Sequence, residues 1–151
     1  MYDLHVTLRP AIVTDLPLIY RGELAYIQCW EPAHESAWRQ HLEKNLAVWV
    51  DNFDRLTVAT LEGQFAGYSL WTPDAGFAEL CTISVSEAYR RKGIGRVLLE
   101  DYAVAAKRSG FTQLRLSVRA DNPARLMYEQ AGFVCVGTGS NAYLLYQRAC
   151  G

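Results

Sequence analysis

Seven short stretches of the chain alternate apolar and polar side chains or are almost wholly apolar, and we predict that each is a β-strand. The strands are expected at 4–9, 55–61, 65–71, 77–85, 112–118, 133–136 and 142–147. Pro10 is expected to end the first of them. Glu62-Gly63-Gln64 predicts a hairpin between the second and third strands, and 137–141 predicts another between the last two.

Four other stretches repeat apolar residues at helical spacing, and we predict helices at 14–29, 36–50, 94–109 and 122–130. Thr14 is the expected N-cap of the first helix, and Gly110 is the expected C-terminal cap of the third. The predicted order is β-α-α-β-β-β-α-β-α-β-β, which indicates the α/β (α+β) class. We find no internal repeat or linker, so residues 1–151 are expected to form a single domain.

The composition is that of a globular protein of 151 residues, half of them hydrophobic and 21% of them charged. The formal net charge of −1 lacks the basic footprint of a nucleic-acid-binding protein. Its apolar runs are too short to cross a bilayer, and its first residues do not resemble a signal peptide. We therefore expect a cytoplasmic protein that binds neither nucleic acid nor membrane.

Neither the cysteines nor the histidines show the spacing of a metal site. The cysteines are Cys29, Cys81, Cys135 and Cys150, and the histidines are His5, His34 and His41. Without CxxC or HExxH spacing, we expect no metal. The cysteines are expected to be reduced thiols packed as small hydrophobic side chains, with Cys81 buried and not catalytic.

The most informative segment is the junction where the strand 77–85 leads into the helix that begins at Ile94. Arg90, Arg91 and Lys92 precede Gly93 there, and Gly95 follows one residue later. A helix start offers unpaired backbone N–H groups, glycine lets the backbone approach a ligand, and the cations favour an anion. The junction therefore indicates a pyrophosphate site, although a capped helix with a solvated basic rim would have the same pattern. The GxxxxGK[ST] and GxGxxG motifs are absent.

Residues 90–95 resemble the (Q/R)xxGx(G/A) motif of the GNAT acyltransferase superfamily, and residues 128–133 match its YExxGF block. Two motifs in the family's order, about 30 residues apart, are more specific than either alone. The strand end, basic loop and V-R-A stretch also resemble ribosomal-protein alanine N-acetyltransferases. Two features differ from the family pattern. Asn122 stands six residues before Tyr128, where the family usually has seven, and 112–118 lacks the acidic residue common in the alanine N-acetyltransferases.

This resemblance implies a mixed, mostly antiparallel sheet of about seven strands with about four helices. It also implies acetyl-CoA as the cosubstrate. The implied cofactor-binding residues are Ile83, Ser84, Val85, Arg90, Arg91, Lys92, Gly93, Ile94, Gly95, Arg96, Asn122 and Tyr128. Tyr128 would protonate the departing CoA thiolate, because its hydroxyl is a workable acid beside a developing thiolate.

The acceptor amine must lose a proton, and Glu79 is the candidate base. It lies in Phe77-Ala78-Glu79, eleven residues before Arg90, and the histone acetyltransferase branch has a similar FAE at the same offset. Strand alternation places Glu79 on the same face as Cys81, Ile83 and Val85. A solvated glutamate at a strand edge is the structural alternative.

Two functions follow from these residues. The favoured one is an N-acetyltransferase in which a primary amine attacks acetyl-CoA directly in a ternary complex. The other is a non-catalytic acyl-CoA-binding regulatory domain. The acceptor could be a protein N-terminus, a lysine or a small-molecule amine, and a homodimer is compatible with the sequence. Candidate acceptor-site residues lie in the first helical region: Tyr26, Trp30, Glu31 and His34.

Overall fold

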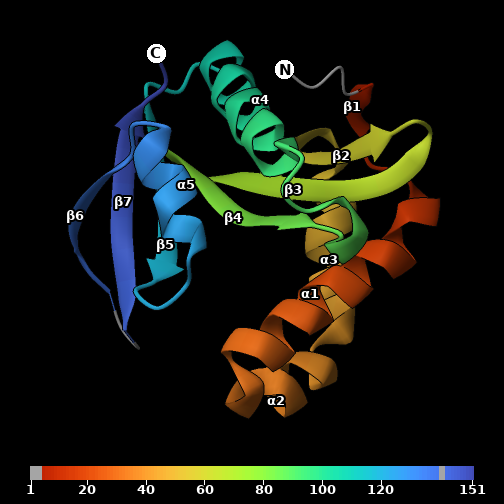
Figure 1. Ribbon diagram of the computed structural model, residues 1–151. Coiled ribbons are helices and arrows are strands. Elements are labelled where there is room, and N and C mark those ends of the chain that lie inside the picture. Colours follow the sequence, from red (N-terminus) through yellow and green to blue (C-terminus); the bar gives the residue numbers. More distant parts are fainter. Residues whose placement is uncertain (1–4, 140–141) are drawn as a thin grey trace. The chain divides into compact units, whose positions relative to one another are not determined.

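The computed structural model describes residues 5–139 and 142–151 (Figure 1). Its strands are β1 (Val6–Pro10), β2 (Leu56–Leu61), β3 (Gln64–Asp74), β4 (Phe77–Val85), β5 (Gln113–Arg119), β6 (Val134–Thr138) and β7 (Tyr143–Ala149). Its α-helices are α1 (Leu16–Trp30), α2 (Glu35–Gln40), α3 (Leu42–Asp51), α4 (Ile94–Arg108) and α5 (Ala124–Gln130). Short 3₁₀ turns are η1 (Val13–Asp15), η2 (Pro32–His34), η3 (Phe53–Arg55) and η4 (Glu87–Tyr89).

The strands form a sheet in the order β1-β2-β3-β4-β5-β7-β6. The β1–β2, β5–β7 and β6–β7 pairs are antiparallel, whereas β4 and β5 are parallel. A parallel pair needs a crossover connection, and α4 provides it. The predicted mixed, mostly antiparallel α/β sheet is confirmed.

The chain divides into two compact units, which are described separately. The first comprises the chain up to Tyr68 together with Ser84–Ile94, and the second comprises Ser69–Ile83 with Gly95–Gly151. In the first unit, β1 pairs with β2 along its whole length, from Val6 opposite Leu61 to Pro10 opposite Thr57. Its largest fully buried side chains are Tyr68, Ile19, Leu56, Ile94 and Val58.

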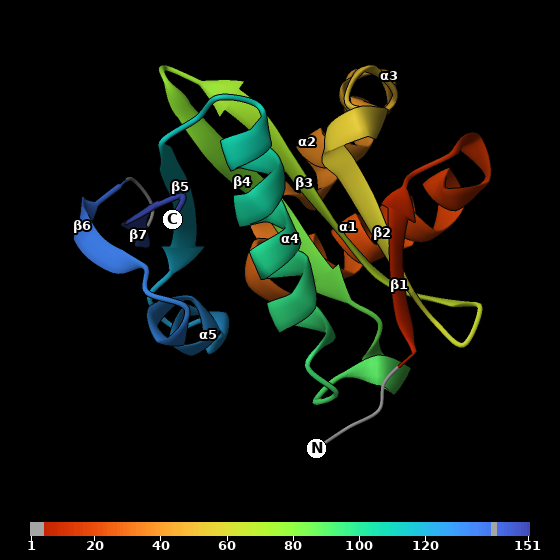
Figure 2. The same cartoon turned by 90° about the horizontal axis from the view of Figure 1, so that it is seen from above.

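The second unit has one continuous apolar core, formed by residues of its strands and of α4 and α5. Leu114, Leu116 and Val118 alternate along the buried face of β5, as their spacing predicts. They pack with Leu99 and Tyr102 of α4 in this core. Figure 2 shows α4 lying over β4, and Figure 1 shows β5, β7 and β6 side by side with α5 next to them.

Two element predictions need correction. The helix expected at 36–50 is two helices, α2 and α3, because the chain turns at His41 and the side-chain amide of Asn45 donates to the Trp38 carbonyl at 3.2 Å. The described helices therefore number five where about four were expected. Pro10 is the last residue of β1, so the first strand ends there as predicted.

Thr14 is also not the N-cap of the first helix. It lies inside the turn η1, and Asp15 takes the N-cap position of α1. The carboxylate of Asp15 instead accepts the Ile12 N–H at 2.8 Å, which closes this turn before the helix begins. Leu4, predicted in the first strand, and Ser140 and Asn141, predicted in the last hairpin, lie outside the described residues.

Candidate active site

The strands β4 and β5 run parallel over a short segment and then continue beyond it. Their register pairs Ala78–Leu80 with Leu114–Leu116, while β4 runs on to Val85 and β5 to Arg119. The hydroxyl of Tyr102 in α4 donates to the Ala78 carbonyl at 2.5 Å and lies 3.4 Å from the Arg115 carbonyl. Helix α4 therefore fixes both strands at the paired segment.

Glu79 lies in this paired segment, opposite Arg115. Nε and Nη2 of Arg115 approach Oε1 of Glu79 at 2.8 and 2.7 Å, and both side chains are 22% exposed. Glu79 is therefore neither buried in an apolar pocket nor freely solvated. It is a partly exposed carboxylate that is held by a guanidinium.

Tyr128 belongs to the core of the second unit. Its residue is 6% exposed, and its ring meets that of Phe133 edge to face at 6.1 Å. Its backbone carbonyl accepts the N–H groups of Ala131 and Phe133, so the turn at the end of the YExxGF block wraps around it. Ile83 of β4, a predicted cofactor-binding residue, packs against the same core. The structure thus brings Tyr128 and Ile83 to one apolar cluster of the second unit.

Asn122 is buried and directly precedes Pro123, the N-cap residue of α5. Its Oδ1 accepts the Ala124 N–H at 2.9 Å, which satisfies one of the unpaired donors at the helix start. This contact gives the predicted cofactor-binding residue Asn122 a structural role.

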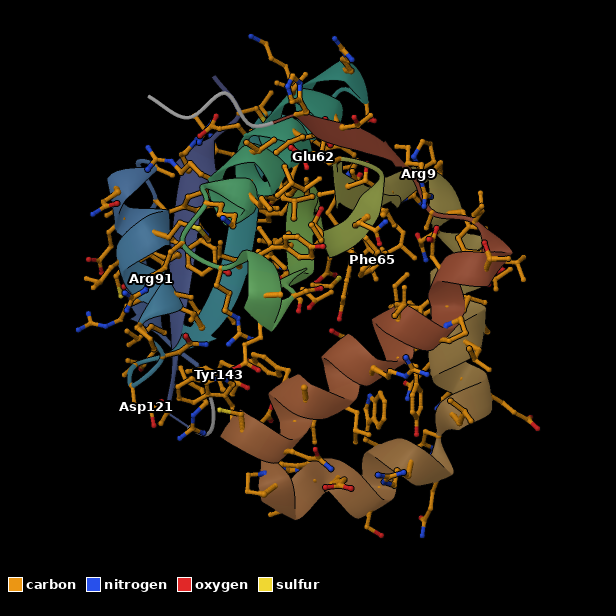
Figure 3. The ribbon with its side chains drawn as sticks, turned by 45° about the vertical axis from the view of Figure 1, so that its right-hand side comes forward. Arg9, Glu62, Phe65, Arg91, Asp121 and Tyr143 are labelled. Carbon is orange, nitrogen blue, oxygen red and sulfur yellow. The ribbon has the colours of Figure 1, made fainter. Side chains whose placement is uncertain are left out.

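The neighbouring carboxylate of Asp121 accepts hydrogen bonds from Arg119 at 3.0 and 3.3 Å, and this contact lowers the pKa of Asp121. Asp121 and Tyr143 lie at the same end of the β5–β7 pair, where Arg119 is opposite Tyr143 (Figure 3).

The basic junction contains two residues with left-handed backbone. Arg91 has φ +65° and Gly93 has φ +80°, a region that only glycine adopts readily. The side chains of Arg90, Arg91 and Lys92 are exposed, as is Gly93. Arg91 is labelled in Figure 3. Apart from its two chain neighbours, no described residue has a heavy atom within 4 Å of where a Cβ on Gly93 would be. An anion can therefore approach the backbone here, so the junction fits a pyrophosphate.

The strand end that precedes the junction is held by β3 within the first unit. The Ser86 N–H donates to the Ala66 carbonyl at 2.8 Å. A Cβ on Gly67 would lie 2.5 Å from the Ser84 carbonyl oxygen, so only glycine allows this approach. On the other side of the junction, Arg90 donates from Nε to the Val85 carbonyl at 3.2 Å. The predicted cofactor-binding residues Ser84 and Val85 thus have a fixed backbone.

The acceptor-site candidates lie on α1 and on the turns after it. Tyr26, Trp30 and Glu31 are half-buried, and His34 is exposed. Helix α1 is anchored at Tyr68, whose hydroxyl donates to Oε2 of Glu23 at 2.7 Å. Burial is the main reason why the pKa of Tyr68 is raised.

The prediction that Cys81 is buried is wrong. Its side chain is exposed, with Sγ 3.3 Å from Oγ1 of Thr72 and 3.7 Å from the Glu79 carbonyl oxygen. The physical reason is strand alternation: Ala78 and Leu80 face the core, so residue 81 lies on the opposite face with Glu79. Cys29 and Cys135 are also exposed, and only Cys150 is packed as a small hydrophobic side chain.

Sequence reasoning did not single out Arg115, Tyr102 or Tyr146. Arg115 occupies an outward position on β5, a strand whose burial alternates, and this was its one visible signal. Arg115 and Glu79 are 36 residues apart in the sequence, and their contact depends on the register of β4 and β5. In the described part of the chain, no group of three or more His, Cys, Asp or Glu could hold a metal, and no helix could cross a membrane.

Comparison with known proteins identifies the family. Residues 21–133 match the model of the acetyltransferase (GNAT) family. The chain is 32% identical over 122 residues to the [ribosomal protein bS18]-alanine N-acetyltransferase of Escherichia coli K12, covering 80% of this chain and 75% of that protein. A shorter match, 40% identical over 62 residues, is to mycothiol acetyltransferase of Jonesia denitrificans, over 40% of this chain and 20% of that protein.

Solved structures have the same fold. PaiA N-acetyltransferase from Thermoplasma acidophilum, in complex with coenzyme A, superposes with a TM-score of 0.81 at 22% identity, covering 95% of this chain and 98% of that one. The alanine N-acetyltransferase of E. coli gives 0.67 at 23% identity, covering 97% and 94%. The fold and the two motifs define an acyltransferase. The chain belongs to the GNAT acetyltransferase family and is an N-acetyltransferase that uses acetyl-CoA.

Proposed function

We propose that this enzyme acetylates the α-amine of a protein N-terminus. The observation that carries this proposal is the 32% identity, over 80% of the chain, to an enzyme named as a [ribosomal protein bS18]-alanine N-acetyltransferase. The chemistry agrees with it. An α-amine has a pKa of about 7.7–8.0 and is partly free at neutral pH, whereas a lysine amine, near 10.4, is almost wholly protonated. A ribosomal-protein acceptor places the reaction in the cytoplasm.

The cosubstrate would be held along one continuous piece of chain. Residues Arg90 to Arg96 hold the pyrophosphate with the N–H groups of the loop and of the first turn of α4, beside the three cations. The backbone of β4 from Ile83 to Val85, beyond the segment paired with β5, binds the pantetheine arm as an added strand would. The same strand end polarises the thioester carbonyl through a backbone N–H.

In the chemical step, Glu79 accepts a proton from the acceptor ammonium, and the free amine attacks the thioester carbon. The new C–N bond forms as the C–S bond breaks, and the hydroxyl of Tyr128 gives its proton to the departing thiolate. The nitrogen, which still carries two protons after the attack, gives one of them to solvent and leaves the neutral amide. Solvent then reprotonates Tyr128 and takes the proton from Glu79. No protein nucleophile is needed in this step, so the exposed thiol of Cys81 has no part in it.

The test is a panel of acceptors assayed by release of the free CoA thiol. One peptide begins with alanine and has no lysine. Its matched control has a blocked N-terminus and one internal lysine, and a polyamine serves as the small amine. We expect thiol release with the first peptide at least tenfold faster than with the others. Faster reaction of the lysine peptide or the polyamine would contradict the proposed acceptor. Binding of acetyl-CoA without release for any acceptor would indicate a regulatory domain instead.

A further inference from the structure

Arg115 approaches Glu79 in a way that fixes one of its two carboxylate oxygens. Both nitrogens of the guanidinium, Nε at 2.8 Å and Nη2 at 2.7 Å, end on Oε1 of Glu79. Charge-assisted contacts of this length are the strong class of hydrogen bond. Because both nitrogens end on this one oxygen, the contact restrains the rotation of the carboxyl group.

Arg115 is itself held in place on two further sides. Its Nη2 donates to Oδ2 of Asp74 at 2.7 Å, and its guanidinium carbon lies 4.6 Å from the centre of the Phe77 ring. Its side chain is only 22% exposed. Because Asp74 and the Phe77 ring already fix the guanidinium, Arg115 loses little further side-chain conformational entropy when it binds Glu79.

The Glu79–Arg115 pair also has a defined place on the strands. It is the middle pair of the paired segment of β4 and β5, next to the point where the register ends. On the opposite face, Tyr102 contacts the carbonyls of Ala78 and Arg115. The backbone of both partners is therefore fixed at the position from which β4 continues toward Ile83.

We infer that Arg115 is the positioning residue for Glu79 in proton removal from the acceptor amine. This inference rests on the proposed role of Glu79 as the base. Arg115 does not touch the reacting atoms. It holds Oε1 so that Oε2 faces the acceptor, because a base must lie within hydrogen-bond reach of its proton. Misplacement of a catalytic group by about 1 Å can cost up to about 10²-fold in rate.

The experiment compares Arg115→Gln, Glu79→Gln and the double variant, at pH 7 and pH 9.5, with the alanine peptide as acceptor. Arg115→Gln is expected to lower kcat at pH 7 by about tenfold or more and to leave the KM for acetyl-CoA unchanged. The defect is expected to shrink at pH 9.5, where the acceptor is free without a base. The double variant is expected to be no slower than Glu79→Gln, because both changes remove one function.

Two further variants separate positioning from stability. Arg115→Lys keeps a positive charge but has one nitrogen in place of the two guanidinium nitrogens that contact Oε1. The kcat of this variant is therefore expected to lie between those of the wild type and Arg115→Gln. Arg119→Gln is the matched control, because Arg119 is on the same face of β5 and pairs with Asp121. It is expected to leave the ratio of activities at the two pH values unchanged.

Each outcome decides the inference. If Glu79→Gln is impaired at pH 7 and recovers at pH 9.5, but Arg115→Gln has wild-type kcat, Arg115 is not a positioning residue. Additive losses in the double variant would also overturn the inference, because Arg115 would then act independently of Glu79. Wild-type activity of Glu79→Gln would overturn the proposed base and the inference with it. A folded state of each variant is checked by its melting temperature and by the dissociation constant of acetyl-CoA.

Discussion

The hydroxyl of Tyr146 on β7 donates a 2.6 Å hydrogen bond to Oε2 of Glu129, the residue that follows Tyr128 on α5. This bond raises the pKa of Tyr146. A second contact ties the end of the same helix to β7, since Arg148 donates from Nη1 to the Ala131 carbonyl at 3.0 Å. The glutamate of the YExxGF block therefore anchors the helix that presents Tyr128.

Tyr146→Phe removes the donor of this bond and keeps the ring of a residue that is 1% exposed. A hydrogen bond to a charged group contributes about 1.5–3 kcal/mol, so the free energy of unfolding should fall by an amount in this range. For a domain of this size, that lowers the melting temperature by roughly 3–12 °C. Glu129→Gln keeps an acceptor oxygen, and we expect a smaller loss for it. Equal melting temperatures for Tyr146→Phe and the wild type would show that the bond does not hold α5.

Much of the fold could be predicted because its patterns are local. The alternation along 112–118 correctly placed Leu114, Leu116 and Val118 in the core, and the order of elements was right apart from the break at His41. That break depends on the Asn45 side chain reaching the Trp38 carbonyl, a contact seven residues apart that has no signature in hydrophobic spacing.

The surroundings of the candidate site could be predicted only in part. Motif spacing was enough to single out the junction at Gly93 and the helix of Tyr128, because neither depends on how two strands pair. The environment of Glu79 could not be obtained in this way, because Arg115 comes opposite Glu79 only through the parallel register of β4 and β5. That register is set by the packing of α4, including the contacts of Tyr102, and a one-residue slip would place Arg115 on the other face.

Gly93→Ala should weaken acetyl-CoA binding beyond what backbone strain explains. Gly63 in the β2–β3 turn is the matched control, because Gly93 and Gly63 have φ of +80° and +82°. Apart from chain neighbours, no described residue has an atom within 4 Å of a Cβ added at either glycine. Each alanine should lower the free energy of unfolding by about 1–2 kcal/mol.

Acetyl-CoA at 100 times its dissociation constant stabilises the wild type by about 2.7 kcal/mol, which is roughly 5–10 °C. We expect this shift to persist in Gly63→Ala and to be lost at the same ligand concentration in Gly93→Ala. Equal dissociation constants for the two variants, measured by calorimetry, would mean that the junction does not hold the pyrophosphate.

The Arg9–Asp15 pair predicts a loss of stability in acid. Arg9 donates to both carboxylate oxygens of Asp15, at 2.7 and 2.9 Å, and Arg9 can be seen in Figure 3. These bonds lower the pKa of the Asp15 carboxyl below its usual 3.8, although burial opposes the shift. The stabilisation is therefore complete above about pH 4 and is lost as the pH falls through the lowered pKa of the folded state.

Asp15→Asn should remove the part of the free energy of unfolding that depends on the ionised carboxylate of Asp15. At pH 7 the variant should be about 1–3 kcal/mol less stable, because Asp15 is 5% exposed and loses its charge-assisted bonds. Below pH 3 the difference from the wild type should become smaller. Urea titrations at pH 7, 4 and 2.5 measure this trend. A difference that is constant over the three pH values would show that the ionised carboxylate of Asp15 does not stabilise the fold.

Tyr128→Phe tests the acid of the chemical step. The variant loses one hydroxyl and keeps the ring that meets Phe133 edge to face. If the hydroxyl protonates the thiolate, kcat should fall by about 10²-fold, the lower range for a positioned acid. The KM for acetyl-CoA should change little, since the hydroxyl acts in the transition state. Raising the pH should not restore activity, in contrast to Glu79→Gln, because the missing proton is needed by the leaving group and not by the amine. Single-turnover rates with enzyme in excess exclude slow product release as the cause. A single-turnover rate equal to that of the wild type would remove Tyr128 from the mechanism and leave its ring as part of the core.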